Sequence, residues 1–194
     1  RSYSSAASDV YKRQLLNSSS CNFDWQPNNF KFSNLSGDQG SFYDSFDING
    51  LLVMFICNHC PYVRSIENKI SSETQRLKDI NVNSIAFMSN DQNAYEEDHD
   101  KFLLKQISRA KFKFDYIIDH TQSIAKLFDA QCTPEFFYFN NEKKLKYRGR
   151  LDSNGKNPSM GNPELYSAVE ESIAKGYCSS QQYPSMGCSI KWKS

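Results

Sequence analysis

The residues best able to do chemistry are two cysteines that enclose two other residues, in Cys57-Asn58-His59-Cys60-Pro61. This C-x-x-C spacing is typical of a redox-active dithiol or of half a metal site. We predict that the Cys57 thiolate attacks a disulfide and that Cys60 resolves the mixed disulfide so formed. The positive charge of a protonated His59 is expected to stabilise the Cys57 thiolate.

Two predicted elements position this pair. Residues 51–56 form an unbroken apolar run, which is typical of a short strand buried on both faces of an α/β sheet. Residues 61–77 then show helical periodicity, with Pro61 near the first turn, where a missing N–H does no harm. We therefore expect Cys57 at the N-terminus of a helix, where the helix dipole favours a thiolate.

A second motif, Cys132-Thr133-Pro134, leads into the aromatic run of residues 135–139. Because proline cannot donate to a sheet and tolerates the cis isomer, we predict a cis Thr133-Pro134 bond beside the dithiol. The backbone at Thr133 is then expected to hold an extended substrate chain. Cys132 has three open interpretations, namely a core residue, a metal ligand or a thiol that traps an oxidised cysteine.

The remainder of the chain predicts a single domain over residues 15–176. Its other expected strands are 82–88, 114–119 and the hairpin 135–148, and its other expected helices are 98–109, one that follows Thr121, and 163–175. Residues 177–194 are expected to form an irregular tail packed on or near the domain, in which Cys178 and Cys188 are a candidate pair. Residues 1–14 look like the translation of a sequencing adapter and are set aside as a scar.

The composition limits the classes of partner, compartment and cofactor that we expect. The 194 residues carry a net charge of +1 from 23 basic and 22 acidic side chains, so neither nucleic acid nor an anionic membrane is an expected partner. No apolar run approaches the roughly 18 residues of a membrane span. Six cysteines are too sparse for a disulfide scaffold, which favours the cytoplasm and leaves the periplasm open. Neither a Gly-rich phosphate loop nor a dinucleotide fingerprint is present, so no organic cofactor is implied.

Several segments together resemble the signature blocks of bacterial thioredoxin-like redoxins, which are grouped with the alkyl hydroperoxide reductase and thiol-specific antioxidant (AhpC/TSA) proteins. They are residues 55–63, 89–91, 132–137, 147–152 and 184–193. The resemblance implies an α/β thioredoxin fold, a central mixed sheet flanked by helices with a peroxiredoxin- or TlpA-like elaboration. It also implies thiol-disulfide exchange with a disulfide-containing protein or small thiol, and an external thiol reductant.

The predicted site follows from these motifs. We assign catalysis to Cys57, Cys60, His59 and Pro134, and substrate contacts to Asn58, Pro61, Thr133 and Cys132. No metal is assigned. Classical thioredoxins carry a Trp and a buried Asp where this chain has Ile56 and Leu51, so Cys60 needs a different proton acceptor.

Two alternatives stay open. The first is a thiol-dependent peroxidase of the AhpC/TSA kind, although the P-x-x-x-[T/S]-x-x-C pattern of peroxiredoxins fits neither cysteine of the pair. The second is a copper- or zinc-binding module that uses Cys57 and Cys60 with a third ligand from Cys132 or His59, since thiolates suit Cu(I) and Zn²⁺.

Overall fold

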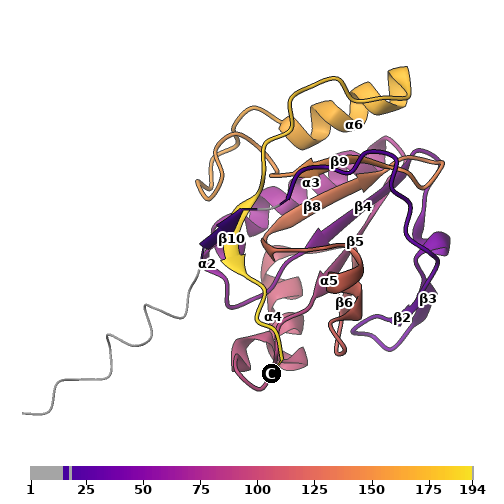
Figure 1. Ribbon diagram of the computed structural model, residues 1–194. Coiled ribbons are helices and arrows are strands. Elements are labelled where there is room, and N and C mark those ends of the chain that lie inside the picture. The colour runs from indigo at the N-terminus through magenta and orange to yellow at the C-terminus, as the bar shows by residue number, and fades with distance from the viewer. Residues whose placement is uncertain (1–14, 18, 194) are drawn as a thin grey trace, which may run out of the picture.

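A five-stranded mixed sheet of order β6-β5-β4-β8-β9 forms the centre of the molecule (Figure 1). The computed structural model describes residues 15–17 and 19–193, so the adapter-like residues 1–14 lie outside the described residues. The strands are β4 (Gly50–Phe55), β5 (Val82–Met88), β6 (Asp115–Ile118), β8 (Glu135–Phe139) and β9 (Leu145–Gly149). β4, β5 and β6 run parallel, and β8 is antiparallel to both β4 and β9. The predicted α/β class is confirmed.

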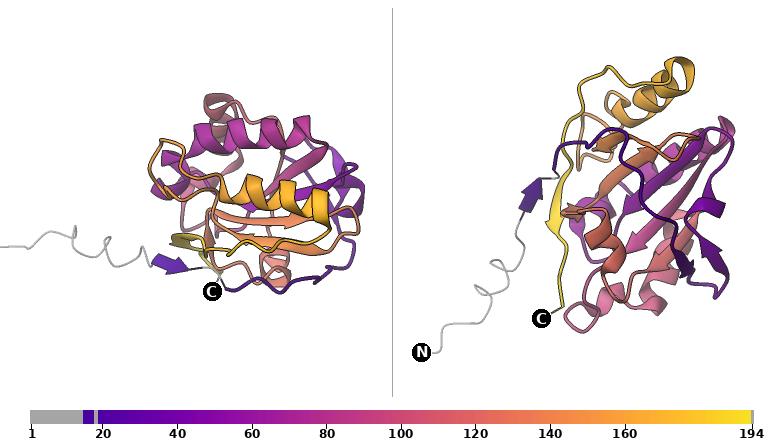
Figure 2. Two further views of the ribbon diagram at one scale, coloured as in Figure 1. Left: turned by 90° about the horizontal axis from the view of Figure 1, so that it is seen from above. Right: turned by 45° about the vertical axis from the view of Figure 1, so that its right-hand side comes forward.

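Helices and a small hairpin cover the two faces of this sheet (Figure 2). On one face α3 (Glu67–Asp79), α4 (Asp100–Ala110) and α6 (Glu164–Lys175) share a core with Leu52 and Met54. On the other face α5 (Ser123–Leu127), the 3-10 helix η1 (Tyr43–Ser45) and the hairpin of β2 (Lys31–Ser33) and β3 (Gln39–Ser41) share a core with Leu51, Val53 and Phe55. Since side chains alternate along a strand, the unbroken apolar run gives β4 an apolar surface on both faces.

The helix predicted after the dithiol is two helices. α2 (Pro61–Ser65) ends at Ile66, whose φ of −117° and ψ of 12° leave the helical region, and α3 starts at the next residue. The apolar residues that indicated one helix are all buried, because both helices present them to the same core.

The C-terminal segment, predicted to be irregular, contains a strand. β10 (Met186–Ser189) pairs antiparallel with β7 (Cys132–Thr133) on one side and with β1 (Leu15–Asn17) on the other (Figure 1). So short a strand carries no clear period in its sequence, which is why the prediction missed it.

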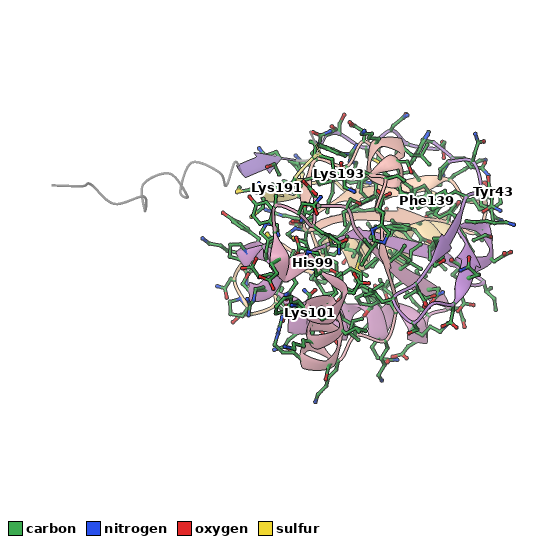
Figure 3. All side chains as sticks on the ribbon, turned by 90° about the horizontal axis from the view of Figure 1, so that it is seen from below. Tyr43, His99, Lys101, Phe139, Lys191 and Lys193 are labelled. Atoms are coloured by element: carbon green, nitrogen blue, oxygen red, sulfur yellow. The ribbon has the colours of Figure 1, made fainter. Side chains whose placement is uncertain are left out.

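The residues after β10 are held against the body of the protein. The amide of Lys191 donates to Asn90 Oδ1 at 2.9 Å, and Lys193 Nζ donates to His120 O at 2.8 Å; both lysines can be followed in Figure 3. Among the described helices, none combines the length and apolarity of a bilayer span.

Candidate active site

The two cysteines of the C-x-x-C motif lie in the connection between β4 and α2, directly against Thr133. Cys57 Sγ lies 3.3 Å from Thr133 Oγ1, and Cys60 Sγ, in its thiol form, donates to Thr133 O at 3.2 Å. The Thr133-Pro134 bond is cis. The sequence prediction of a cis bond beside the dithiol is confirmed.

The expected position of Cys57 at a helix N-terminus is wrong. The residue at the N-cap of α2 is Cys60, with Pro61 exposed at the first helical position, and Cys57 lies three residues earlier. Both cysteines are reduced and fully buried. The positive end of the helix dipole therefore acts on Cys60 rather than on Cys57.

The two thiols differ in acidity, in the opposite sense to the sequence prediction. Hydrogen bonds from the Cys188 and Cys57 thiols lower the pKa of Cys60. Burial raises the pKa of Cys57, and the nearby carboxylate of Asp98 adds to this rise. The Thr133 carbonyl favours a protonated Cys60, but more donors than acceptors surround this sulfur, so the pair holds its thiolate on Cys60.

His59 is paired with a carboxylate that the sequence did not point to. Its Nδ1 lies 2.6 Å from Asp98 Oδ2, and Tyr95 stacks on its ring with 4.2 Å between the centroids. Asp98 is completely buried and also accepts hydrogen bonds from the Asn58 and His59 amides and from Asn90 Nδ2. The sequence places Asp98 only at the start of the helix expected over residues 98–109. The tuning charge expected from His59 is therefore opposed at the site by Asp98.

Asn58 faces the protein interior instead of a substrate. Its Nδ2 donates to Glu97 O at 2.8 Å, and its Oδ1 accepts from Arg109 Nη2 at 3.0 Å. Arg109 is in turn paired with Glu67 Oε1 at 2.6 Å. These bonds fix the turn between the two cysteines, so Asn58 contributes rigidity to the dithiol, and its predicted substrate contact finds no support in this geometry.

Of the two thiols near the cis proline, Cys188 rather than Cys132 meets the dithiol. In the antiparallel β7–β10 pair, Thr133 lies opposite Cys188, and Cys132 lies opposite Ser189. Directly opposed side chains share a face of the pair, so Cys188 lies on the face from which Thr133 reaches Cys57. Cys132 points the other way, with its sulfur 3.8 Å from Ser185 O.

The candidate disulfide between Cys178 and Cys188 does not form, since both cysteines are free. Cys188 is buried in the same core cluster as Cys57 and Cys60. Cys178 lies at the rim of that cluster and, together with Cys21, lines a separate surface hollow. The register of β10, which no local sequence signal supplied, decides where Cys188 points.

A small apolar pocket of about 240 Å³ opens beside Pro134. Its lining includes Tyr62, Phe136, Leu151 and Met186. One wall is the loop of residues 152–161, which Lys69 holds in place: its Nζ lies 2.7 Å from Asp152 Oδ2 and donates to three backbone carbonyls of that loop. The larger hollow between α3 and the end of α4, about 590 Å³, has no cysteine in its lining.

One group of side chains in the described part of the chain brings three possible metal ligands together. Donor atoms of Cys57, His59 and Asp98 all lie within 4.8 Å of one another. A thiolate, an imidazole and a carboxylate are acceptable ligands for Zn²⁺. This group differs from the set expected from the sequence, which combined Cys57 and Cys60 with Cys132 or His59, because it lacks Cys60 and includes Asp98.

Comparison with known proteins places the chain in a family. Residues 26–148 match the AhpC/TSA family. The chain belongs to the AhpC/TSA family. Its members are typically thiol-based oxidoreductases, which agrees with a buried dithiol against a cis proline. No curated protein sequence matches this AhpC/TSA chain significantly.

Solved structures support the thioredoxin-like fold of this AhpC/TSA protein. An uncharacterized conserved protein from Geobacillus kaustophilus is 32% identical with a TM-score of 0.84, over 93% of this chain and 97% of that one. A hypothetical protein from Sinorhizobium meliloti 1021 is 29% identical with a TM-score of 0.84, and the match covers 92% of this chain and 98% of that one. A putative thiol:disulfide interchange protein DsbE from Chlorobium tepidum is 13% identical with a TM-score of 0.60, and the match covers 79% of this chain and 99% of that one. At this identity the likeness shows the fold alone. The predicted thioredoxin fold is confirmed.

Proposed function

We propose that this protein is a thiol-disulfide oxidoreductase that uses Cys57 and Cys60. The observation that carries the proposal is the contact of both sulfurs with Thr133, at 3.3 and 3.2 Å, immediately before a cis proline. The substrate is a disulfide in a protein or small thiol compound, and an external thiol reductant returns the pair to the dithiol. We keep the cytoplasmic location expected from the sparse cysteines as part of this proposal.

The exchange begins with a proton transfer inside the pair. Cys57 passes its proton to the Cys60 thiolate along their existing contact, and the Cys57 thiolate attacks one sulfur of the substrate disulfide. A Cys57–substrate disulfide forms and the other half of the substrate leaves as a thiolate. That leaving thiolate accepts from Cys60 the proton that Cys57 had passed on, and Cys60 is a thiolate again. The leaving group thus serves as the proton acceptor in place of the aspartate that thioredoxins carry.

The second step closes the active-site disulfide. The Cys60 thiolate attacks Cys57 Sγ, the Cys57–substrate bond breaks, and the second half of the substrate leaves as a thiolate that takes a proton from water. Two electrons have then passed from the dithiol to the substrate. Cys60 is suited to this step, because the surroundings that lower its pKa keep it ionised.

The substrate surface differs from the one expected from the sequence. Strand β10 already pairs with the backbone of Cys132–Thr133, where an extended substrate chain was expected. We propose instead that an apolar group next to the substrate disulfide enters the pocket beside Pro134 and Met186. Because neither active-site sulfur is exposed, part of β10 or of the pocket rim must move for the sulfurs to meet a substrate.

A trapping experiment tests the function. The Cys60→Ser protein is mixed with a peptide disulfide or with glutathione disulfide, and the adduct is mapped by mass spectrometry. We expect a stable mixed disulfide on Cys57, because the resolving sulfur is gone. Cys178→Ser, a half-buried cysteine away from the dithiol, is the matched control and should turn over substrate like the parent protein.

Three outcomes would count against the proposal. An adduct on Cys60 in Cys57→Ser but none on Cys57 in Cys60→Ser would reverse the order of attack. Absence of any adduct in both variants would remove the exchange function. Rapid oxidation by hydrogen peroxide with no reaction towards disulfides would favour the peroxidase alternative.

Metal binding is a second candidate, favoured by the convergence of Cys57, His59 and Asp98. Its test is a titration of the reduced protein with Zn²⁺, followed by competition with a chelator. Tight stoichiometric binding that is lost in Asp98→Asn and kept in Cys132→Ser would support a carrier. Binding that is unchanged by Asp98→Asn would exclude this donor set.

A further inference from the structure

Strand β10 occupies the edge next to the cis proline and brings a third thiol to the dithiol. Cys188 is directly opposite Thr133 in the antiparallel pair, and both side chains lie on the face that contacts Cys57. Cys188 is buried with Cys57 and Cys60 in one core cluster. An extended segment with a sulfur in this position has the arrangement expected of a bound substrate.

The position of β10 is enforced by the residue before Cys188. A Cβ atom on Gly187 would lie 2.0 Å from Thr133 O and 2.7 Å from its carbonyl carbon, so only glycine allows the strands to approach this closely. On the far side, β1 pairs with β10 and places Leu15 opposite Cys188. Cys188 is therefore held in register on both sides.

Cys60 is the middle member of three sulfurs. It has hydrogen-bond contacts with both the Cys57 and the Cys188 thiol. Cys132, the other thiol of this region, lies on the opposite face of the strand pair, because the register places it opposite Ser189. A disulfide between Cys57 and Cys60 would thus present its Cys60 sulfur to Cys188.

We propose that Cys188 is an internal exchange partner of the dithiol, an inference that rests on the proposed disulfide chemistry of Cys57 and Cys60. The Cys188 thiolate attacks Cys60 Sγ of the oxidised pair, a Cys60–Cys188 bond forms, and the Cys57–Cys60 bond breaks. Cys57 leaves as a thiolate and takes up the proton that Cys188 lost. The disulfide moves within the chain, so no external oxidant or reductant is consumed.

This step gives the protein two oxidised forms. In one the disulfide joins Cys57 and Cys60, and in the other it joins Cys60 and Cys188 and leaves Cys57 as a thiol. The second form stores the two-electron oxidation in the core while its attacking residue is again reduced. β10 then acts as an internal substrate in place of the external chain predicted at Thr133.

The test uses Cys57→Ser with glutathione disulfide as the oxidant. Cys60 first forms a mixed disulfide with glutathione, and Cys188 then displaces the glutathione to give Cys60–Cys188, which is identified by mass spectrometry of the non-reduced digest. We expect the glutathione bound to Cys60 to be released at least about tenfold faster in Cys57→Ser than in Cys57→Ser/Cys188→Ser, because the attack by Cys188 is intramolecular. Cys57→Ser/Cys132→Ser is the matched control and should behave like Cys57→Ser.

The parent protein separates this inference from the proposed function. Suppose that the oxidised parent forms a Cys57–Cys60 disulfide but glutathione stays on Cys60 in Cys57→Ser. The inference about Cys188 would then be wrong, while the proposed function would stand. Failure to form either Cys57–Cys60 or Cys60–Cys188 in the oxidised parent would overturn the function as well. In the oxidised parent we also expect a maleimide to label a fraction of Cys57, and Cys188→Ser should lose that labelling.

Discussion

His59 Nδ1 lies 2.6 Å from Asp98 Oδ2, so the imidazole between the two cysteines is paired with a carboxylate that is entirely withdrawn from water. Asp98 comes from the 3-10 helix η2 (Glu96–Asp98), which β5 and its following loop deliver to the dithiol. The pair bears on the reduction potential, because an anion beside Cys57 opposes the negative charge that the dithiol carries only in its reduced form.

The first prediction is that His59 and Asp98 shift the potential of the Cys57–Cys60 couple in opposite directions. Asp98→Asn removes an anion beside the pair, which carries a thiolate only when it is reduced, so the reduced form is stabilised and the potential rises; a tenfold change in the equilibrium constant corresponds to about 30 mV. His59→Gln leaves Asp98 without its partner and lowers the potential. The measurement is a glutathione redox titration read by thiol labelling.

The double variant is the control for this pair. His59→Gln/Asp98→Asn should lie closer to the parent potential than either single variant, because the carboxylate and the side chain that pairs with it are both replaced. Equal potentials in all four proteins would show that the pair only shapes the turn. Stabilisation of the thiolate should then come from the helix terminus at Cys60.

The second prediction concerns the pH dependence of the thiolate. The lowered pKa of Cys60 means that one thiolate persists below the ordinary cysteine range near pH 8.5 and is lost only on stronger acidification. Burial raises the pKa of Cys21 to about 12 and that of Cys57 above its usual value, so these thiols stay protonated there. Absorbance at 240 nm against pH measures this, and Cys60→Ser should abolish the low-pH thiolate. Its persistence in that variant would contradict our assignment.

The third prediction is that Gly187→Ala loosens β10. The added methyl collides with the Thr133 carbonyl, and relieving this collision should lower the free energy of unfolding by about 1–3 kcal/mol. Alkylation of Cys57 and Cys60 in the folded protein should become faster, because β10 no longer covers them. Met186→Ala, an exposed residue of the same strand, is the control and should alter neither quantity much.

The fourth prediction concerns the buried ion pair of Lys69 and Asp152. Lys69→Met leaves the Asp152 carboxylate buried without its cation, so the free energy of unfolding should fall by about 3–5 kcal/mol. The loop of residues 152–161 should become sensitive to proteases. Urea unfolding measures the loss, Lys156→Met on the same loop is the exposed control, and Lys69→Met/Asp152→Asn should regain part of the stability.

The sequence predicted the fold and the centre of the site, because their signals are local. The apolar run of β4, the C-x-x-C spacing and the proline before β8 each lie within a few residues. Asp98 and Cys188 were missed for the opposite reason. Each reaches the dithiol through pairing or packing between segments distant in the chain, and the residues around them indicated only the start of a helix and an irregular tail.

Cys57 was misplaced by a finer effect. Periodicity finds a helix but does not fix its first residue, and α2 starts at Pro61, after both cysteines. Because the helix starts about one turn later than predicted, its positive end lies at the second cysteine instead of the first. It therefore changes which thiol is the acidic one, although the predicted pair of residues is the same.

The late position of β10 in the chain has a consequence for synthesis. The central sheet and the cis-proline loop are complete in sequence at Gly149, whereas β10 starts at Met186. At about 5–20 residues per second, a ribosome needs about two to seven seconds for that interval. A nascent chain that has folded its sheet thus keeps the edge at Thr133 unpaired during this time, and its dithiol meets other thiols and disulfides before its own Cys188 has been made.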